Sequence, residues 1–296
     1  MDPAILKILT ELNQRSLSGG GFEEFPGKGY RPDSTAWAVM AFSAVDLNHA
    51  SIAPALRSLT RSQSGDGGVA LLPEYPQACW PTPLAILAWM NFQECAEPLQ
   101  RAISFLLHFT GVHGDNPVGS PLAHNTALKG WPWIADTHSW VEPTALSVIA
   151  LRSAGHRGHS RIAEAVEMLM DRQLHDGGWN YGNTEVYGQQ LSPMPDSTGL
   201  ALCALSGLIT EKEVIGSIAY LNETVPEIRT PFSLSWGLLG LNAWNRPHET
   251  AGEFIDRCMN RRFLYGGFST THLCLLLLAH PDMAQSSIFQ MQGSKT

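Results

Sequence analysis

Six short segments of the chain are hydrophobic on nearly every side when they are drawn as helices. Each follows a threonine or a serine, and these opening residues are Thr35, Thr82, Thr144, Thr198, Ser233 and Thr270. Hydrophobic residues recur four, five and seven positions after most of them, a spacing that fits a helix. A helix without a polar face is buried on most of its sides. The pattern therefore predicts six interior helices.

A second set of segments alternates with the first and has one hydrophobic and one polar face, the usual pattern of a surface helix. These segments cover residues 3–15, 51–63, 98–109, 160–173, 211–223 and 249–261. Six exterior helices paired with six interior ones predict an all-α fold, an (α/α)6 toroid or barrel. We expect residues 1–282 to form this single domain and residues 283–296 to form a C-terminal tail.

Glycines cluster where four of the exterior helices are expected to end, at residues 19–21, 67–68, 177–178 and 266–267. Glycine adopts positive φ without steric cost and therefore stops a helix well. A glutamine precedes three of the clusters, at Gln14, Gln63 and Gln173. We expect its side chain to bond free backbone groups at the helix end.

The sequence at the end of one exterior helix resembles a known repeat. The spacing Gln173-x-x-Asp176-Gly177-Gly178-Trp179 is similar to the QW repeat of squalene–hopene cyclases and their relatives. The alternation of helices resembles the α/α toroid that those cyclases share with protein prenyltransferase β subunits. At the level of repeats the resemblance covers nearly the whole chain. It implies the toroid, but a fold of this kind also serves proteins without isoprenoid chemistry.

The letters PDST occur at residues 32–35 and again at 195–198, each time before an interior helix. Class II terpene cyclases of this superfamily carry a DxDD motif whose middle aspartate protonates an alkene or an epoxide. Laid over residues 194–197, the motif keeps only its middle aspartate, Asp196. The resemblance implies Asp196 as the general acid. Asp33 occupies the same place in the first repeat and is the second catalytic candidate, while Glu142 fills it in the third.

The same three acids have an alternative interpretation as helix caps. An aspartate before Ser-Thr and a hydrophobic run is a preferred N-cap, and the N–H groups it binds favour its charged form. An acid that protonates an alkene must instead stay neutral in a dry pocket. The sequence leaves both interpretations open.

Aromatic side chains stabilise carbocations and surround hydrophobic chains. Several of the nine tryptophans fall on interior helices or on the loops that lead into them. The connection over residues 111–143 is long enough to act as a lid or a binding loop. The predicted substrate-binding residues are Trp37, Trp89, Trp133, Trp140, Trp179, Tyr181, Trp236 and His272.

No metal or cofactor is expected. Residues 271–274 are similar to the HxC segment with which protein prenyltransferases bind zinc, but residues 230–233 lack the aspartate and cysteine that would complete the site. The chain also lacks a DDxxD motif for magnesium, a P-loop and a dinucleotide fingerprint.

Composition narrows the partners and the location. The net charge of −8 argues against nucleic acid as the main partner, because nucleic acid rewards a basic face. Five dispersed cysteines are typical of free thiols in a reducing compartment. The first residues do not resemble a signal peptide and no run of apolar residues is long enough to cross a bilayer. We therefore expect a cytoplasmic protein that contacts membranes at most transiently.

The sequence favours a terpene cyclase-like enzyme that protonates and cyclises an isoprenoid in an aromatic cavity. The main alternative is a non-catalytic toroid that binds an apolar ligand or a partner protein. A carbohydrate-active enzyme is the third, since Asp33, Glu142 and Asp196 open different helices at one end of the barrel. A homodimer or a partner that closes the barrel also remains open.

Overall fold

The computed structural model describes residues 2–114, 123–264 and 266–286. The even-numbered helices are those predicted to lie inside, and they are α2 (Pro32–Val45), α4 (Thr82–Trp89), α6 (Val141–Leu151), α8 (Pro195–Leu205), α10 (Pro231–Ala243) and α12 (Thr270–Ala279). The odd-numbered helices are the predicted exterior ones, namely α1 (Pro3–Asn13), α3 (Ile52–Arg61), α5 (Ala96–His108), α7 (Ser160–Asp171), α9 (Glu211–Thr224) and α11 (Ala251–Arg261). The prediction of a helical fold is confirmed.

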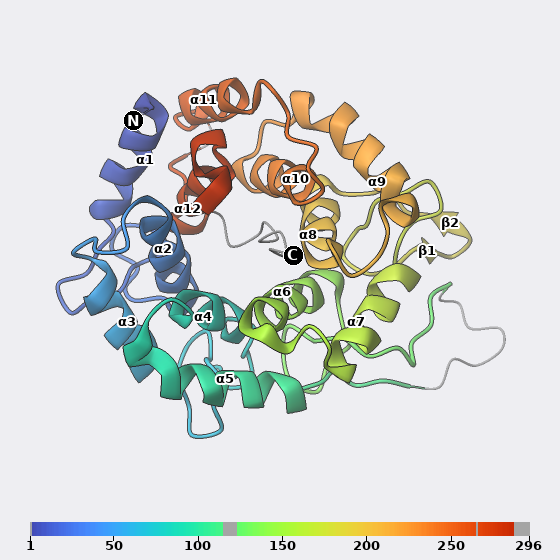
Figure 1. Cartoon of the computed structure of the whole chain (residues 1–296), viewed down its shortest axis with the longest axis horizontal. Coiled ribbons are helices and arrows are strands. Elements are labelled where there is room, and N and C mark those ends of the chain that lie inside the picture. The colour runs from blue at the N-terminus through green and yellow to red at the C-terminus, as the bar shows by residue number, and fades with distance from the viewer. Residues whose placement is uncertain (1, 115–122, 265, 287–296) are drawn as a thin grey trace, which may run out of the picture.

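Each even-numbered helix packs against the next, and α12 packs against α2, so that this set closes on itself. The odd-numbered helices lie outside it (Figure 1). The remaining elements are short turns of helix, η1 (Gln93–Cys95), η2 (Arg152–His156), η3 (Val225–Glu227) and η4 (Pro281–Ser286), and one small hairpin of β1 (Glu185–Val186) and β2 (Gln189–Gln190). The hairpin lies in the loop before α8 and was not predicted.

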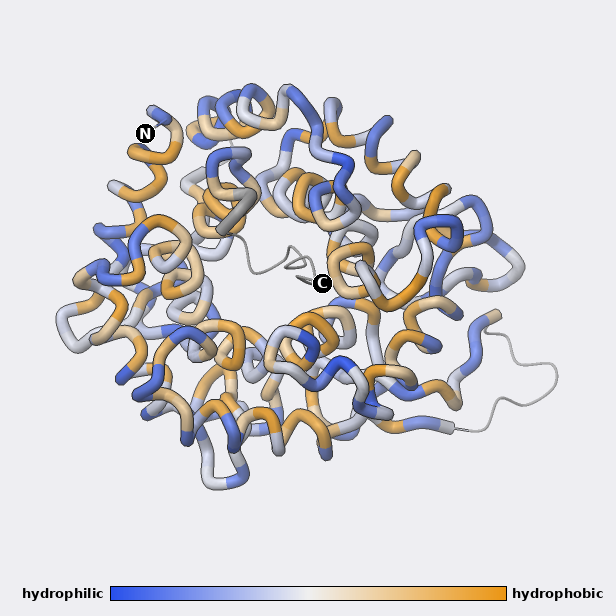
Figure 2. Tube along the Cα trace, viewed as in Figure 1, coloured by the Kyte–Doolittle hydropathy of each residue, from blue (hydrophilic) through white to orange (hydrophobic). Residues whose placement is uncertain are grey.

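Hydrophobicity follows the two sets of helices as the sequence pattern predicts. Figure 2 shows the even-numbered helices as mostly hydrophobic, whereas hydrophobic and hydrophilic positions alternate along the odd-numbered ones. All eight residues of α4 are buried, but only every third or fourth residue of α1 is. The main core therefore fills the space between the two sets.

The recurrent threonine lies in the first turn of α2, α4, α6 and α8, where it has a structural role. The hydroxyl oxygen of Thr35 accepts the N–H of Phe22, that of Thr82 accepts Val69, that of Thr144 accepts Trp131 and that of Thr198 accepts Trp179, each at 2.9 Å. Each donor directly follows a glycine. The hydroxyl thus fixes the loop that leads from an exterior helix to the next interior one.

The glycine before the donor has its own reason at Gly178. Its φ is 84°, and an added Cβ would lie 2.5 Å from the Pro193 side chain and 3.1 Å from the Thr198 hydroxyl. The positive φ and the nearby Pro193 therefore leave room only for glycine at this position.

Thr198→Val should lower the free energy of unfolding by about 1–3 kcal/mol, because it keeps the shape but leaves the buried N–H of Trp179 without its acceptor. Thr198→Ser keeps the hydroxyl and should cost clearly less. Urea denaturation of the two variants checks this. Equal losses would show that the hydrogen bond does not hold the loop.

Gln173 and Trp179, the two ends of the QW-like repeat, connect neighbouring exterior helices through their side chains. The Gln173 amide donates to the Ser217 hydroxyl of α9 at 2.9 Å, and the Trp179 indole donates to the Leu169 carbonyl of α7 at 2.6 Å. Gln63 similarly bonds the Pro98 carbonyl of α5 at 2.8 Å. The glutamine thus bridges to the next exterior helix, which is more than the local role expected from the sequence.

The interpretation of the acids at the PDST positions as N-caps is wrong. The N-cap residues of α2, α6 and α8 are Arg31, Trp140 and Met194, and none of them forms a side-chain cap. Asp33, Glu142 and Asp196 are each the second residue of their helix. Their carboxyls are therefore free for other contacts.

All five cysteines are buried, unpaired thiols, as the sequence suggested. Among the described helices, none is both long and apolar enough to cross a membrane.

Candidate functional site

A cavity of about 360 Å³ lies at the end of the inner ring where the even-numbered helices begin. Its walls come from the first two turns of α2, α6 and α10, from the start of α12, from α4 and from the loops that precede these helices. The lining residues are Glu24, Phe25, Asp33, Trp37, Trp80, Leu84, Trp133, Glu142, Leu146, Phe232, Trp236, Ser269, Thr271 and His272. The cavity therefore combines a hydrophobic, mostly aromatic wall with several carboxyls.

The aromatic wall consists of interlocking edge-to-face pairs. The rings of Trp37 and Trp236 are 6.0 Å apart, and those of Trp80 and Trp133 are 5.4 Å apart. Phe232 packs edge-on against Trp236 at 6.5 Å. Such pairs hold their rings in fixed orientations, and their faces attract positive charge. The wall suits an apolar ligand and any cation that forms on it.

Glu142 is the carboxyl with the most unusual environment in the cavity. Burial raises the pKa of Glu142 to about 7, and repulsion from the nearby Asp196 carboxylate adds to the effect. Among the described residues, no hydrogen bond that would favour the charged form opposes this shift of the Glu142 pKa. At neutral pH a large fraction of Glu142 is therefore a neutral acid that faces an aromatic cavity.

Asp196 lies on α8, the helix next to α6, and is 9% exposed. Its Oδ1 accepts a hydrogen bond from the Ser233 hydroxyl at 3.1 Å. Asp196 does not line the cavity itself. It is close enough to Glu142 for its negative charge to favour the protonated form of Glu142.

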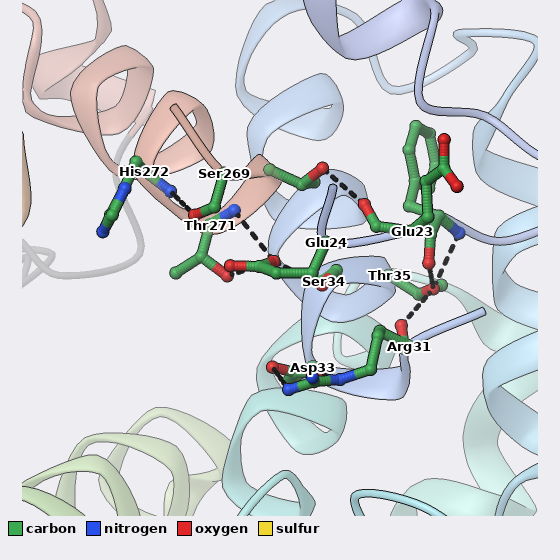
Figure 3. Close-up of polar contacts among 11 residues, drawn as sticks. Glu23, Glu24, Arg31, Asp33, Ser34, Thr35, Ser269, Thr271 and His272 are labelled. Atoms are coloured by element: carbon green, nitrogen blue, oxygen red, sulfur yellow. Dashed lines mark hydrogen bonds and ion pairs between the residues drawn. The ribbon is translucent and has the colours of Figure 1, made fainter. Parts of the chain in front are cut away.

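Asp33 lines the cavity but is already paired. Both of its oxygens accept from the Arg31 guanidinium, at 2.9 and 2.8 Å (Figure 3). Burial raises the pKa of Asp33, and the Arg31 contact opposes that shift. The ion pair favours the charged form, which makes Asp33 a poorer proton donor than Glu142.

Glu24 completes the polar side of the cavity. Its Oε2 accepts from the hydroxyls of Ser34 at 2.5 Å and Thr271 at 3.0 Å, and from the Thr271 N–H at 3.4 Å. Figure 3 shows this carboxyl between α2 and α12. Oε2 is the acceptor in all three of these hydrogen bonds, and Oε1 takes part in none of them. Glu24 therefore links the first and last interior helices and keeps Oε1 as an acceptor for a ligand.

His272 lies on α12 at the same wall. Its ring packs edge-on against Phe232 at 6.2 Å and against Phe268 at 6.2 Å. Burial lowers the pKa of His272 below its ordinary value, and attraction from Glu24 only partly opposes this. The imidazole is therefore neutral at pH 7 and able to accept a proton.

The structure brings five of the residues predicted from the sequence into this cavity: Asp33, Trp37, Trp133, Trp236 and His272. The others lie elsewhere. Trp89 and Trp179 are fully buried in the core, Trp140 lines a separate cavity of about 230 Å³, and Tyr181 is 53% exposed. Trp179 does not face the cavity because its indole is held by the exterior helix α7.

Sequence reasoning missed Glu24, Trp80 and Phe232 as site residues. It considered Glu142 as a helix cap or as one acid of a carbohydrate-active site, and not as the acid of a cyclase. Glu142 could have been found, since it aligns with Asp33 and Asp196 at the second position of an interior helix. Glu24 had no such signal. It lies in a loop and meets α12 through contacts that span 247 positions of the chain.

The predicted lid over residues 111–143 is only partly described, because residues 115–122 lie outside the described residues. Of its aromatic residues, Trp133 lines the cavity, while Trp131 is buried and donates its indole N–H to the Leu106 carbonyl at 2.9 Å. Within the described part of the chain, no group of three or more His, Cys, Asp or Glu is arranged to hold a metal ion.

Comparison with solved structures supports the fold. A protein from Actinoplanes matches with a TM-score of 0.60 and 15% identity, over 95% of this chain and 98% of that one. The type II terpene cyclase MstE from Scytonema matches with a TM-score of 0.55 over 95% of this chain and 79% of its own. Its identity to this chain is 14% without ligand and 13% in a variant in complex with geranylgeranyl dihydroxybenzoate, its substrate.

Salmonella alpha-2-macroglobulin matches with a TM-score of 0.51 and 14% identity, over 93% of this chain but only 17% of its own. No protein-family model matches the chain, and no curated protein matches it in sequence. At these identities the likenesses establish a terpene cyclase-like fold and do not establish an activity. They show a fold and single out no family, squalene–hopene cyclases included.

Proposed function

We propose that this chain is an (α/α)6 toroid enzyme of the type II terpene cyclase kind, which protonates an isoprenoid and cyclises it inside the aromatic cavity. The observation that carries the proposal is Glu142, a carboxyl whose pKa burial raises to about 7, on the wall of that cavity. An acid that starts a cyclisation must be protonated at the working pH and shielded from water. Glu142 meets the first condition better than Asp33, because the ion pair with Arg31 favours the charged form of Asp33.

In this proposal Glu142 carries the proton, and the neighbouring Asp196 carboxylate favours the protonated form of Glu142 by charge repulsion. Glu142 lines the cavity and delivers the proton to the substrate. Asp196, the acid implied by the family resemblance, acts through Glu142 as a positioning and charge-bearing partner.

The reaction balances as an isomerisation. The Glu142 O–H bond breaks, and the proton adds to one carbon of a terminal C=C bond, or to the oxygen of an epoxide, whose C–O bond then opens to leave a hydroxyl group. The electron-poor carbon is then attacked by a second C=C bond of the same molecule, which closes the ring. The aromatic faces of Trp37, Trp80, Trp133 and Trp236 stabilise the resulting cation. Loss of a proton to neutral His272 or to solvent ends the sequence.

The second candidate function is binding without chemistry. The cavity alone would hold an apolar ligand, and the same aromatic wall serves this role. The neutral Glu142 carboxyl favours an enzyme over a carrier. A buried acid does not strengthen the binding of an apolar chain, so a carrier would have no use for it.

The proposal is tested with purified protein incubated with squalene, oxidosqualene and prenols of increasing length, with product analysis by GC-MS. We expect a cyclic isomer from the wild type, a loss of about 10²-fold or more in Glu142→Gln, and a smaller loss in Asp33→Asn because Asp33 is paired with Arg31. If the wild type binds a prenol but returns every substrate unchanged, the binding function replaces the enzymatic one.

A further inference from the structure

The charge of the cavity limits the kind of substrate it accepts. Three carboxyls line it, those of Glu24, Asp33 and Glu142, and neither a lysine nor an arginine does so among the described residues. Arg31 approaches from outside the lining, and both oxygens of Asp33 occupy its guanidinium. A ligand with a diphosphate head would find no cationic side chain in this lining to pair with, and it would bring several negative charges beside the Glu24 carboxyl, which opposes binding.

The polar side of the cavity is instead built to receive a hydrogen-bond donor. The Oε2 atom of Glu24 takes the Ser34 and Thr271 hydroxyls, which fixes the carboxyl in place. An ionised carboxylate accepts at both oxygens and donates at neither. The second oxygen of Glu24 is therefore a preorganised acceptor for an O–H or N–H group on the ligand.

Glu24 and Glu142 lie at different places on the cavity wall, and together they set the orientation of a bound ligand. Glu24 and Thr271 lie where α2 meets α12, whereas Glu142 belongs to α6, with α4 between α2 and α6 in the inner ring. A polar head at Glu24 directs the apolar tail along the tryptophans toward Glu142. The C=C bond that takes the proton is then remote from the head.

The volume limits the length of the tail. A cavity of about 360 Å³ is at the lower end of the range of small-molecule sites. If each non-hydrogen atom takes about 30 Å³, as a water molecule does in the liquid, the cavity holds about twelve such atoms. A ten-carbon prenol has about that many, and a twenty-carbon one has far more.

We propose, on the basis of the function proposed above, that the substrate is a short isoprenoid of about ten carbons whose head is a neutral or positively charged hydrogen-bond donor, held by Glu24, and not a diphosphate. A hydroxyl and an ammonium share this chemistry. Geraniol and geranylamine, which carry the same tail, distinguish the two heads.

Binding is measured without turnover, from the quenching of tryptophan fluorescence, because four of the nine tryptophans line the cavity. The probes are geraniol, farnesol and geranylgeraniol, the ammonium geranylamine, and geranyl diphosphate. We expect geraniol to bind at least about tenfold more tightly than geranyl diphosphate, and farnesol more tightly than geranylgeraniol. A diphosphate that binds as tightly as the alcohol, or a geranylgeraniol that binds more tightly than farnesol, overturns the proposal.

The role of Glu24 is tested with Glu24→Gln, which keeps the size of the side chain and removes its charge. Geranylamine should bind about tenfold more weakly to this variant, and geraniol less than about threefold more weakly. The matched control is Glu23→Gln, because the neighbouring Glu23 carboxyl bonds the Lys28 N–H and does not line the cavity. Equal affinity of Glu24→Gln and Glu23→Gln for geranylamine would contradict the assignment.

Failure of this proposal and failure of the proposed function give different results. Selective binding of short alcohols or amines without a cyclic product supports the substrate class and removes the enzymatic function. Cyclisation of a diphosphate, or of a substrate of twenty or more carbons, supports the enzymatic function and removes the substrate class. The wild-type ligand series does not depend on whether any variant folds.

Discussion

Replacing Glu142 by glutamine should reduce the rate of cyclisation by about 10²- to 10⁴-fold, the usual contribution of a positioned general acid. Glutamine has nearly the same size but no proton acidic enough to transfer. The wild-type rate should fall as the pH rises through about 7, because the Glu142 carboxyl then loses its proton and its pKa lies there. Initial rates between about pH 5 and 9 measure both effects. Glu97→Gln, on the exposed face of α5, is the control and should keep the wild-type rate and pH profile.

The same variant has a second, independent readout in stability. The pKa of Glu142 is higher in the folded chain, about 7, than its ordinary value of 4.5, so the folded state holds a proton that the unfolded state has lost between these values. The wild type therefore loses stability as the pH rises through this window, by about 3 kcal/mol when 1 pKa unit is worth about 1.4 kcal/mol. The Glu142→Gln variant should not lose stability in this way, because glutamine does not ionise.

Urea denaturation at about pH 4.5 and about pH 8.5, on either side of this window, checks the expectation. The variant should be close to the wild type at the lower pH and more stable than it at the higher one. A stability difference between variant and wild type that is the same at both pH values would show that Glu142 is not held neutral by its surroundings.

Gly199→Ala should have the largest effect on folding, a loss of about 3 kcal/mol or more. Gly199 lies where α8 crosses α10, and an added Cβ would overlap the backbone carbonyl of Trp236. Gly240 faces it from α10, where a Cβ would lie 2.6 Å from the Gly199 Cα. The two helices approach so closely that a methyl group must separate them, and Trp236 on the cavity wall would move with α10.

Thermal or urea unfolding measures the loss. The control is Gly252→Ala in α11, where a Cβ meets nothing within 4 Å and a better helix former should raise stability slightly. A Gly199→Ala variant as stable as Gly252→Ala would contradict the close packing of α8 on α10.

The helical fold was readable from the sequence because its two hydrophobic patterns differ so clearly. The uniformly apolar α4 and the striped α1 could be assigned to the inside and the outside from those patterns alone, since burial determines them directly. Gly178 and Thr198 were visible as recurrent letters, but their contact was not, because they are brought together from opposite ends of a loop.

The candidate site was only half predictable. Tryptophans on interior helices could be counted, but Trp89 and Trp236 look alike in sequence, and only the packing of the ring decides that one lies in the core and the other on the cavity. The pKa of Glu142 depends on burial and on Asp196, which lies 54 positions later on the adjacent helix. Such properties belong to the assembled ring and leave no local signal in the chain.

The most direct test of Glu142 as the initiating acid is cyclisation in D₂O of a substrate that is protonated at a C=C bond, because a deuteron on an epoxide oxygen would exchange away during work-up. Proton transfer from Glu142, which exchanges with solvent, should place one deuterium on the carbon that receives it, and GC-MS should show the product one mass unit heavier. Glu142→Gln should yield no labelled product. A cyclic product without deuterium, or a labelled product formed equally well by Glu142→Gln, would contradict Glu142 as the acid that starts the reaction.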